Sequence, residues 1–224
     1  MRERIVNRLR SIVLEVRIGT FDQFRRIKPF DKLNKETLEK NSQKLLPYYK
    51  EYIRDVSRPD MAASLELAVF MYTVCKLNGY SKLLDMGSGF SSFVFRLYAS
   101  ETPGVRVYTV DDDAAWLEKT RQFLQQHKLD VKNIFELKEF LSLRESDFDC
   151  ILHDLNFVEA RINHVDLLMQ IAKHNGMVIF DDAHKPDYRV ALLSKLKGSS
   201  AKLYDLKPVT RDGYGRFSLA AIKK

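Results

Sequence analysis

The sequence has few cysteines, few prolines and no long hydrophobic run. Of its 224 residues, two are cysteine and six are proline. Cys75 and Cys150 both lie in apolar segments, which predicts reduced, buried thiols, excludes a disulfide framework and fits a cytoplasmic protein. No stretch approaches the ~18 consecutive apolar residues that a membrane-spanning helix needs, so we expect a soluble, unprocessed chain without a transmembrane segment. With 45% hydrophobic and 30% charged residues, the composition is unlike that of a disordered protein.

The positive charge is concentrated at the N-terminus. Residues 1–60 contain 15 Lys and Arg against 9 Asp and Glu, whereas residues 61–224 contain 22 against 21. Apolar residues at helical spacing near the start predict a basic amphipathic helix there. A second helix is expected from about Lys35 to Val56, with a break at Pro47. We interpret residues 1–58 as a helical segment that forms a lid or a homo-oligomer contact; contact with a membrane surface or with nucleic acid is the alternative.

Strand and helix patterns alternate from Pro59 onward. Such alternation predicts a parallel sheet with helices on both faces. Two closing strand patterns, separated by the turn TRDGYG and by no helix, add an antiparallel strand at or near one edge. The predicted fold class is therefore α/β: residues 59–224 form a Rossmann-like three-layer sandwich with a mostly parallel sheet, behind the helical N-terminal segment. A helix is expected from Met61 to Leu77, and strands at KLLDM, VRVYTV, KNIFEL, FDCILHD, GMVIFDD, AKLYDLKPV and RFSLAAI.

The first strand runs into a glycine-rich loop, in the sequence LLDMGSGFSS at residues 83–92. A phosphate-binding P-loop would need a Lys after the last glycine, and none is there. A dinucleotide-binding loop would need a third glycine where Ser92 stands, and Asp85 would repel a pyrophosphate, which counts against a nicotinamide-dependent oxidoreductase. A carboxylate here suits a ligand with a cationic amino group and no phosphate, such as S-adenosylmethionine.

Two motifs together resemble those of the class I S-adenosylmethionine-dependent methyltransferases. LLDMGSGFSS is similar to the family's first motif, and its GSGFSS is close to a subgroup of bacterial small-molecule methyltransferases. VYTVDDDAAWLEKTR is similar to the second motif, in which an acid closes the second strand. The resemblance runs from about Ser81 to Ile222 and implies S-adenosylmethionine as the cofactor. For Asp112 and Asp113, capping of the following helix is the preferred alternative. The cofactor contacts implied by the resemblance are Asp85 near the methionine amino group, Gly87, Ser88 and Gly89 along the methionine part, Asp111 and Asp112 at the ribose, Leu137 and Lys138 at the adenine, and Asp154.

Carboxylates also follow the predicted fourth and fifth strands, at Asp154 and at Asp181 and Asp182. The carboxyl ends of parallel strands share one edge, so these acids would repel one another unless a cation joins them or they point apart. Oxygen-only ligands favour Mg²⁺ or Ca²⁺. The three positions resemble the metal-holding acids of O-methyltransferases that act on catechols and macrolide sugars, although Leu155 and Asn156 depart from that pattern. In the alternative, Asp154 faces the cofactor and Asp181 or Asp182 caps a helix or meets a basic side chain.

Methyl transfer requires an aligned acceptor and the removal of its proton. His184 is the best placed general base, and Asp154 is the other catalytic candidate; strand alternation turns His153 away from Asp154. The run DLNF at residues 154–157 lacks the Asn/Asp-Pro-Pro-aromatic pattern of enzymes that methylate base amino groups. The expected function is therefore methyl transfer from S-adenosylmethionine to a small-molecule hydroxyl, with a divalent metal such as Mg²⁺ as a further expectation. A nucleic-acid-binding protein or an RNA methyltransferase on the same scaffold is the alternative.

Overall fold

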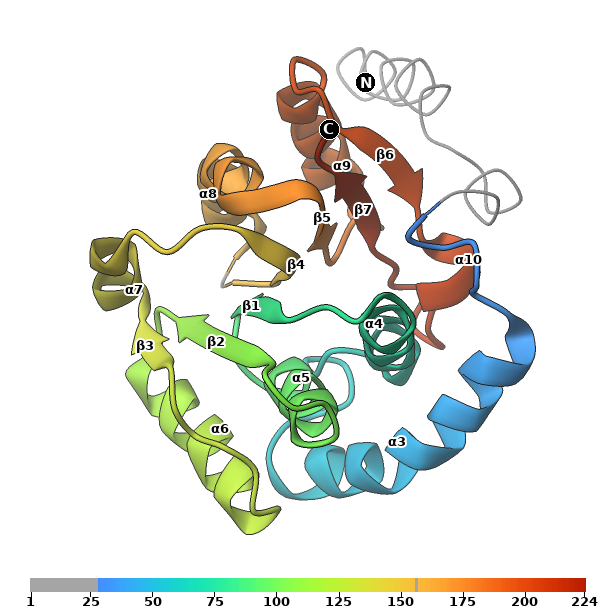
Figure 1. Cartoon of the computed structure of the whole chain (residues 1–224), viewed down its shortest axis with the longest axis vertical. Helices are drawn as coiled ribbons and strands as arrows, with labels where there is room; N and C mark the ends of the chain where they lie inside the picture. Colours follow the sequence, from blue (N-terminus) through green and yellow to red (C-terminus); the bar gives the residue numbers. More distant parts are fainter. Residues whose placement is uncertain (1–27, 156) are drawn as a thin grey trace.

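The computed structural model describes residues 28–155 and 157–224, which fold around a seven-stranded sheet (Figure 1). The strands lie in the order β3-β2-β1-β4-β5-β7-β6. The predicted basic amphipathic helix and the prediction for Asn156 lie outside the described residues. The strands are β1 (Lys82–Met86), β2 (Arg106–Asp111), β3 (Ile134–Glu136), β4 (Phe148–His153), β5 (Ala172–Phe180), β6 (Lys202–Asp205) and β7 (Leu219–Ile222).

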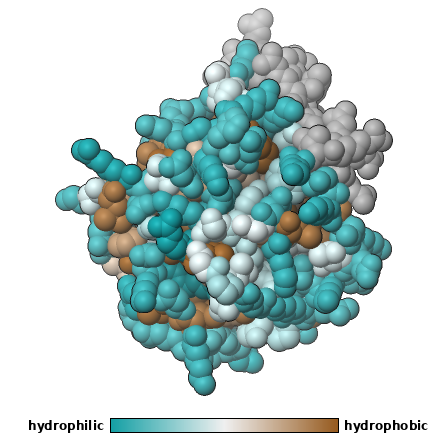
Figure 2. Space-filling model, viewed as in Figure 1, coloured by the Kyte–Doolittle hydropathy of each residue, from teal (hydrophilic) through white to brown (hydrophobic). Residues whose placement is uncertain are grey.

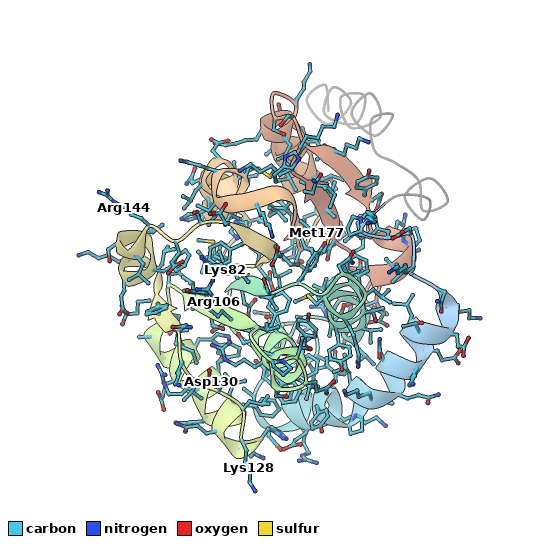
Figure 3. The ribbon with its side chains drawn as sticks, in the orientation of Figure 1. Lys82, Arg106, Lys128, Asp130, Arg144 and Met177 are labelled. Atoms are coloured by element: carbon cyan, nitrogen blue, oxygen red, sulfur yellow. The ribbon has the colours of Figure 1, made fainter. Side chains whose placement is uncertain are left out.

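The sheet is parallel from β3 to β5, and β7 runs antiparallel to both β5 and β6. Lys82 and Arg106, the first residues of β1 and β2, are register partners and lie close together in Figure 3. We call the edge at which the parallel strands begin the amino edge. The edge at which they end, next to Gly87, Asp111, Asp154 and Asp181, is the carboxyl edge. This topology confirms the predicted fold class, including an antiparallel strand near one edge of the sheet.

Helices cover both faces of the sheet (Figure 1). On one face lie α4, α5 and α6, with α3 packed against α4 and the short α10 beside it. On the other face lie α7, α8 and α9. The helices are α3 (Lys35–Asp55), α4 (Leu65–Asn78), α5 (Phe90–Ser100), α6 (Ala114–Gln126), α7 (Leu137–Leu143), α8 (Val158–Ile171), α9 (Pro186–Leu196) and α10 (Lys207–Thr210).

The ends of α4 follow from its capping residues. Ser64 Oγ accepts a hydrogen bond from the backbone N–H of Leu67 at 3.1 Å, so the helix begins at Leu65 and not at Met61 as predicted. Gly79 ends the helix with φ at 63°, a left-handed conformation that glycine adopts without strain.

The predicted break at Pro47 is wrong, because α3 continues through it. A proline inside a helix costs about 3 kcal/mol through its lost N–H and its clash with the preceding turn. Leu45 and Tyr52, on either side of Pro47, are almost completely buried, and this burial offsets that cost. Two helices also lie where none was predicted: α7 follows β3 directly, and α10 separates β6 from β7.

The sheet residues alternate between two hydrophobic clusters. Leu83 faces the cluster of α4 and α5, and Leu84 faces the cluster of α8 and α9. Leu45 and Tyr52 of α3 belong to the first cluster. The core therefore continues across residue 58, the predicted boundary of the N-terminal segment, whose role as a lid or oligomer contact stays a prediction.

The surface in Figure 2 is mostly hydrophilic, and its hydrophobic side chains form small separate patches. No helix within the described residues combines the length and the apolar character needed to cross a membrane.

Candidate functional site

The loop between β1 and α5 contains Gly87 and Gly89, with φ at 115° and 150°. A Cβ atom on Gly87 would lie 2.4 Å from the carbonyl carbon of Asp154, and one on Gly89 would lie 3.0 Å from the hydroxyl of Tyr52. The two glycines therefore let the loop pass between the end of β4 and helix α3. At Gly87, the missing Cβ allows a close approach to the backbone of Asp154.

Asp85 of β1 is completely buried beneath this loop. Its Oδ2 accepts hydrogen bonds from the hydroxyls of Ser91, at 2.9 Å, and Ser92. Its Oδ1 has no hydrogen-bond partner among the residues that the structure describes. Burial raises the pKa of Asp85 to about 7, although the two serines and Arg96 oppose the shift. A buried carboxylate oxygen without a donor is costly, so Oδ1 is a position that calls for a further donor.

Asp111 closes β2 and holds the glycine loop in place. Its Oδ2 accepts a hydrogen bond from the backbone N–H of Ser88 at 2.6 Å, and its Oδ1 accepts one from that of Asp113 at 3.1 Å. Each carboxylate oxygen can accept a second bond, so two hydroxyl donors can still be accommodated. The indole of Trp116 donates to the carbonyl oxygen of Ser88 at 2.7 Å and fastens the loop from the other side.

The neighbouring acids Asp112 and Asp113 differ in their roles. Asp113 is the N-cap of α6, because its Oδ1 accepts hydrogen bonds from the backbone N–H groups of Ala115 at 2.9 Å and Trp116 at 3.1 Å. The preferred capping role is thus confirmed for Asp113. Asp112 has an exposed side chain, and its contact with a cofactor stays a prediction.

Leu137 and Lys138, the predicted adenine contacts, lie on the same edge of the sheet as Asp111. Asp111 and Glu136 are register partners across β2 and β3, which places the next two residues beside the end of β2. Leu137 is half-buried and packs on the cluster of α8 and α9, and Lys138 is exposed. The structure brings both to the candidate site, and their contact with adenine stays a prediction.

Tyr52 of α3 packs over the glycine loop. Its ring centroid lies 5.4 Å from that of Phe90 and 5.0 Å from that of Phe123. Burial and the nearby charges of Asp85 and Asp111 raise the pKa of Tyr52, so its hydroxyl stays neutral. Helix α3 therefore forms one wall of the site.

At the end of β4, Asp154 pairs with a buried arginine of α8. Arg161 Nη2 lies 2.7 Å from Asp154 Oδ1, and Arg161 Nη1 lies 3.1 Å from Asp182 Oδ2. Burial raises the pKa of the Asp154 carboxyl, and the positive charge of Arg161 opposes that shift. The cation expected to join the acids is thus supplied by a side chain.

The two acids after β5 have separate partners. Asp181 accepts a hydrogen bond from the hydroxyl of Ser218 at 2.7 Å, and burial raises its pKa, as does the nearby charge of Asp182. Asp182 adopts φ at 60° and accepts a hydrogen bond from Lys185 Nζ at 2.7 Å. Burial acts to raise the pKa of Asp182, but Lys185 and Arg161 outweigh it and hold that pKa below its usual value. This is the alternative arrangement, in which an acid meets basic side chains.

The predicted magnesium site at Asp154, Asp181 and Asp182 does not fit this geometry. An all-oxygen metal site requires carboxylates directed at one point. Asp154 and Asp182 instead direct oxygens at Arg161, and Asp181 bonds Ser218. Within residues 28–155 and 157–224, no group of three or more His, Cys, Asp or Glu could hold a metal ion.

His184, the predicted general base, lies beside Asp182. Its Nδ1 is 3.5 Å from Asp182 Oδ1, and its side chain is 25% exposed. His153 is completely buried, with Nε2 3.0 Å from the carbonyl oxygen of Arg161, and burial lowers its pKa to about 3. His153 is therefore neutral and turned away from the site, as strand alternation predicts, whereas the role of His184 stays a prediction.

Sequence reasoning missed Arg161 and Tyr52. Arg161 follows Asp154 by about two helical turns of chain, and Tyr52 belongs to the segment that we separated from the domain. No spacing rule links either residue to the glycine loop. The only available signal for Arg161 was the requirement that a cation compensate the acids.

Comparison with known proteins supports the fold assignment. No protein-family model and no curated protein sequence matches this chain. The O-methyltransferase TomG from Streptomyces achromogenes, solved in complex with SAM, is 17% identical with a TM-score of 0.59, over 85% of this chain and 91% of that one. The O-methyltransferase from Bacillus cereus, solved in complex with SAH, is 14% identical with a TM-score of 0.61, over 94% of this chain and 100% of that one. These similarities show that the chain has the fold of those O-methyltransferases.

Proposed function

We propose that this chain is an S-adenosylmethionine-dependent methyltransferase that acts on a hydroxyl group of a small molecule. The observation that carries the proposal is the fully buried Asp85 carboxylate, whose Oδ1 has no donor among the described residues and lies beneath a glycine loop without a phosphate-binding lysine. The fold shared with O-methyltransferases bound to SAM or SAH supports it. When bound, S-adenosylmethionine supplies a methyl group on a sulfonium centre and a cationic amino group.

The residues of the carboxyl edge fit that cofactor. Asp85 Oδ1 accepts a hydrogen bond from the amino group, and this charge-assisted bond favours the ionised carboxylate that burial opposes. Asp111 would accept hydrogen bonds from the ribose hydroxyls with the remaining acceptor capacity of its carboxylate. Leu137 and Lys138 contact the adenine from beyond β3.

His184 acts as the general base. It receives the proton that the acceptor hydroxyl loses, and Asp182, whose Oδ1 lies 3.5 Å from Nδ1, stabilises the resulting positive charge. Lys185 and Arg161 keep Asp182 ionised for this role. Asp154 is held by Arg161 and lies against the glycine loop, where it would border the bound cofactor.

The setting that we propose is the cytoplasm, which is consistent with the two free, buried cysteines. We also propose that the N-terminal helices mediate homo-oligomer contacts, which sedimentation of the full chain tests. The nucleic-acid alternative is disfavoured, because buried and half-buried carboxylates at Asp85, Asp111 and Asp154 would repel a phosphate backbone at the candidate site.

Calorimetry with S-adenosylhomocysteine tests the cofactor assignment. We expect binding by the wild type and a loss of about tenfold or more in Asp111→Asn, because one of the two carboxylate oxygens becomes an NH₂ donor, which cannot accept a hydrogen bond from a ribose hydroxyl. Asp166→Asn is the matched control, since Asp166 lies on α8 with a side chain that is 74% exposed. Absence of binding by the wild type, or equal affinity of the two variants, would contradict the proposal.

The acceptor assignment is tested by mass spectrometry. The protein and S-adenosylmethionine are incubated with a panel of small phenols, sugars and amines, and methylated products are identified. We expect methylation at oxygen, and His184→Ala should abolish turnover while S-adenosylhomocysteine affinity stays the same. Products methylated only at nitrogen would contradict the proposal that the acceptor is a hydroxyl group.

A further inference from the structure

One buried arginine links the acids at the ends of β4 and β5. The side chain of Arg161 is 7% exposed, and its Nη2 and Nη1 reach Asp154 at 2.7 Å and Asp182 at 3.1 Å. Its Nε donates to the carbonyl oxygen of Leu155 at 3.0 Å. All three nitrogens of the guanidinium therefore contact protein oxygens, from the segments that follow two neighbouring strands.

The backbone of Arg161 is also fixed. Its carbonyl oxygen lies 3.0 Å from Nε2 of His153, which is completely buried. A carbonyl oxygen can only accept, so Nε2 donates this hydrogen bond, and in the neutral ring that burial favours the proton is on Nε2. Arg161 is thus held through both its backbone and its side chain, so the fold fixes the position of the guanidinium.

The cations around the acids already supply the positive charge of a divalent ion. Lys185 Nζ bonds Asp182 at 2.7 Å, so Arg161 and Lys185 together face Asp154 and Asp182. A divalent ion placed between these carboxylates would lie within a few ångströms of a fixed guanidinium, and like charges at such distances repel strongly in a buried site. The third acid, Asp181, directs its Oδ1 at Ser218.

We propose that Arg161 stands in place of the divalent cation of metal-dependent O-methyltransferases, so that this chain needs no metal ion. The inference rests on the proposed function and deepens it. Arg161 is a positioning residue, which fixes Asp182 beside His184 and Asp154 against Gly87. Each of its three nitrogens contacts a protein oxygen, so its role is to hold Asp154 and Asp182, and deprotonation falls to His184.

The test measures ion binding by the full chain without cofactor, using Tb³⁺ luminescence and its displacement by Mg²⁺ or Mn²⁺. We expect no saturable site in the wild type, and no change of its thermal midpoint on adding Mg²⁺ or EDTA. Arg161→Met removes the charge and keeps an apolar stem, leaving Asp154 and Asp182 without the guanidinium. This variant should bind Tb³⁺ at least about tenfold more tightly than the wild type, and Mg²⁺ should raise its thermal midpoint by about 2–4 °C.

Arg189→Met is the matched control, because the Arg189 side chain is also 7% exposed and pairs with an acid, Asp205, at 2.9 Å. We expect it to lose stability and gain no ion binding, and we expect Asp154→Asn to remove the site gained in Arg161→Met.

A saturable wild-type Mg²⁺ or Mn²⁺ site lost in Asp154→Asn would overturn the proposal, as would a folded Arg161→Met without the gain. If that variant does not fold, the wild-type measurement decides alone. Failure of the wild type to bind S-adenosylhomocysteine would instead count against the proposed function, since no cofactor enters this test.

Discussion

Asp149 and Asp85 are two buried aspartates of the same sheet, one at its amino edge and one at its carboxyl edge. Asp149 accepts hydrogen bonds from the backbone N–H groups of Ser81 at 2.8 Å and Lys82 at 3.0 Å, and from Lys173 Nζ at 3.0 Å. Burial acts to raise the pKa of Asp149, but these donors outweigh it and hold the pKa below its usual value. Burial raises the pKa of Asp85, whose Oδ1 has no donor within residues 28–155 and 157–224.

The same contrast extends along both edges. At the amino edge, Lys82, labelled in Figure 3, pairs with Glu145 at 2.5 Å, and Lys82 also donates to the carbonyl oxygen of Ser146 at 2.7 Å. At the carboxyl edge, burial raises the pKa values of Asp154 and Asp181 as well. Asp149 and Glu145 at the amino edge are thus engaged with neighbouring groups, whereas Asp85 at the carboxyl edge keeps one oxygen without a donor among the described residues. This unequal use of one residue type supports the carboxyl edge as the place of the proposed site.

The largest expected effect comes from Gly87→Ala, which adds a methyl group at the carboxyl edge. Its Cβ would lie 2.4 Å from the Asp154 backbone, with φ at 115°, so we expect a loss of about 3–5 kcal/mol in the free energy of unfolding. Gly104→Ala, near the amino edge, has φ at 85° but nothing within 4 Å of the added Cβ, and should cost only about 1 kcal/mol. Urea unfolding measures both. Equal losses would show that the backbone conformation, and not the contact with Asp154, determines the cost.

An exchange of aspartate for asparagine at each edge should give opposite results. Asp149→Asn weakens several bonds to a buried carboxylate, so we expect it to lose about 2–3 kcal/mol of stability while cofactor affinity stays the same. In Asp85→Asn, an amide oxygen still accepts from the serine hydroxyls, and its NH₂ group faces the place proposed for the cofactor's amino group. That variant should keep or gain stability and bind S-adenosylhomocysteine at least about tenfold more weakly.

Urea unfolding and calorimetry at pH 8 measure these two responses. Loss of cofactor affinity in both variants, or in neither, would show that the division between a structural edge and a functional edge is wrong.

The sequence predicted the elements of the fold because their signals are local. KLLDM and VRVYTV form β1 and β2 as predicted, since a short apolar run before a turn indicates a buried parallel strand. The break at Pro47 was wrong because a tertiary contact overrode a local rule: the burial of Leu45 and Tyr52 holds α3 together. Helix α10 was missed because its four residues, KPVT, carry no helical periodicity.

The candidate site was predictable to the extent that it lies at strand ends. Strand order alone brings Asp85, Asp111 and Asp154 to one edge, and this part of the prediction needed no side-chain detail. What compensates each acid could not be predicted, because no spacing rule links an acid at a strand end to a particular side chain in the helix that follows it. Serine hydroxyls bond Asp85, whereas a guanidinium from α8 bonds Asp154. A metal ion and an arginine satisfy the same electrostatic requirement, and the sequence does not distinguish between them.

The smallest expected effect is the pH dependence that Asp85 gives to the cofactor-free protein. Its pKa in the folded protein is about 7, against an ordinary value of 3.8, so between these values the folded state retains a proton that the unfolded state has lost. The stability contributed by this proton is complete below pH 4 and is lost as the pH rises through 7. From pH 5 to pH 7 we therefore expect the free energy of unfolding to fall by about 2 kcal/mol through this group. Asp149 has the opposite sign, since its lowered pKa adds stability that is lost only as the pH falls below its ordinary value.

Cofactor binding should show the reverse trend, because the amino group prefers an ionised Asp85. The affinity for S-adenosylhomocysteine is expected to rise with pH, by up to about tenfold per unit below pH 7, and to level off above it. Asp111, Asp154 and Asp181 also have raised pKa values and add slopes of the same sign to the stability, so the contribution of Asp85 is the difference between the wild type and Asp85→Asn. Urea unfolding and calorimetry across pH 5–8 measure this difference. If Asp85→Asn retains both slopes in full, the proton resides on another acid of the carboxyl edge, and the contrast between Asp85 and Asp149 loses its functional meaning.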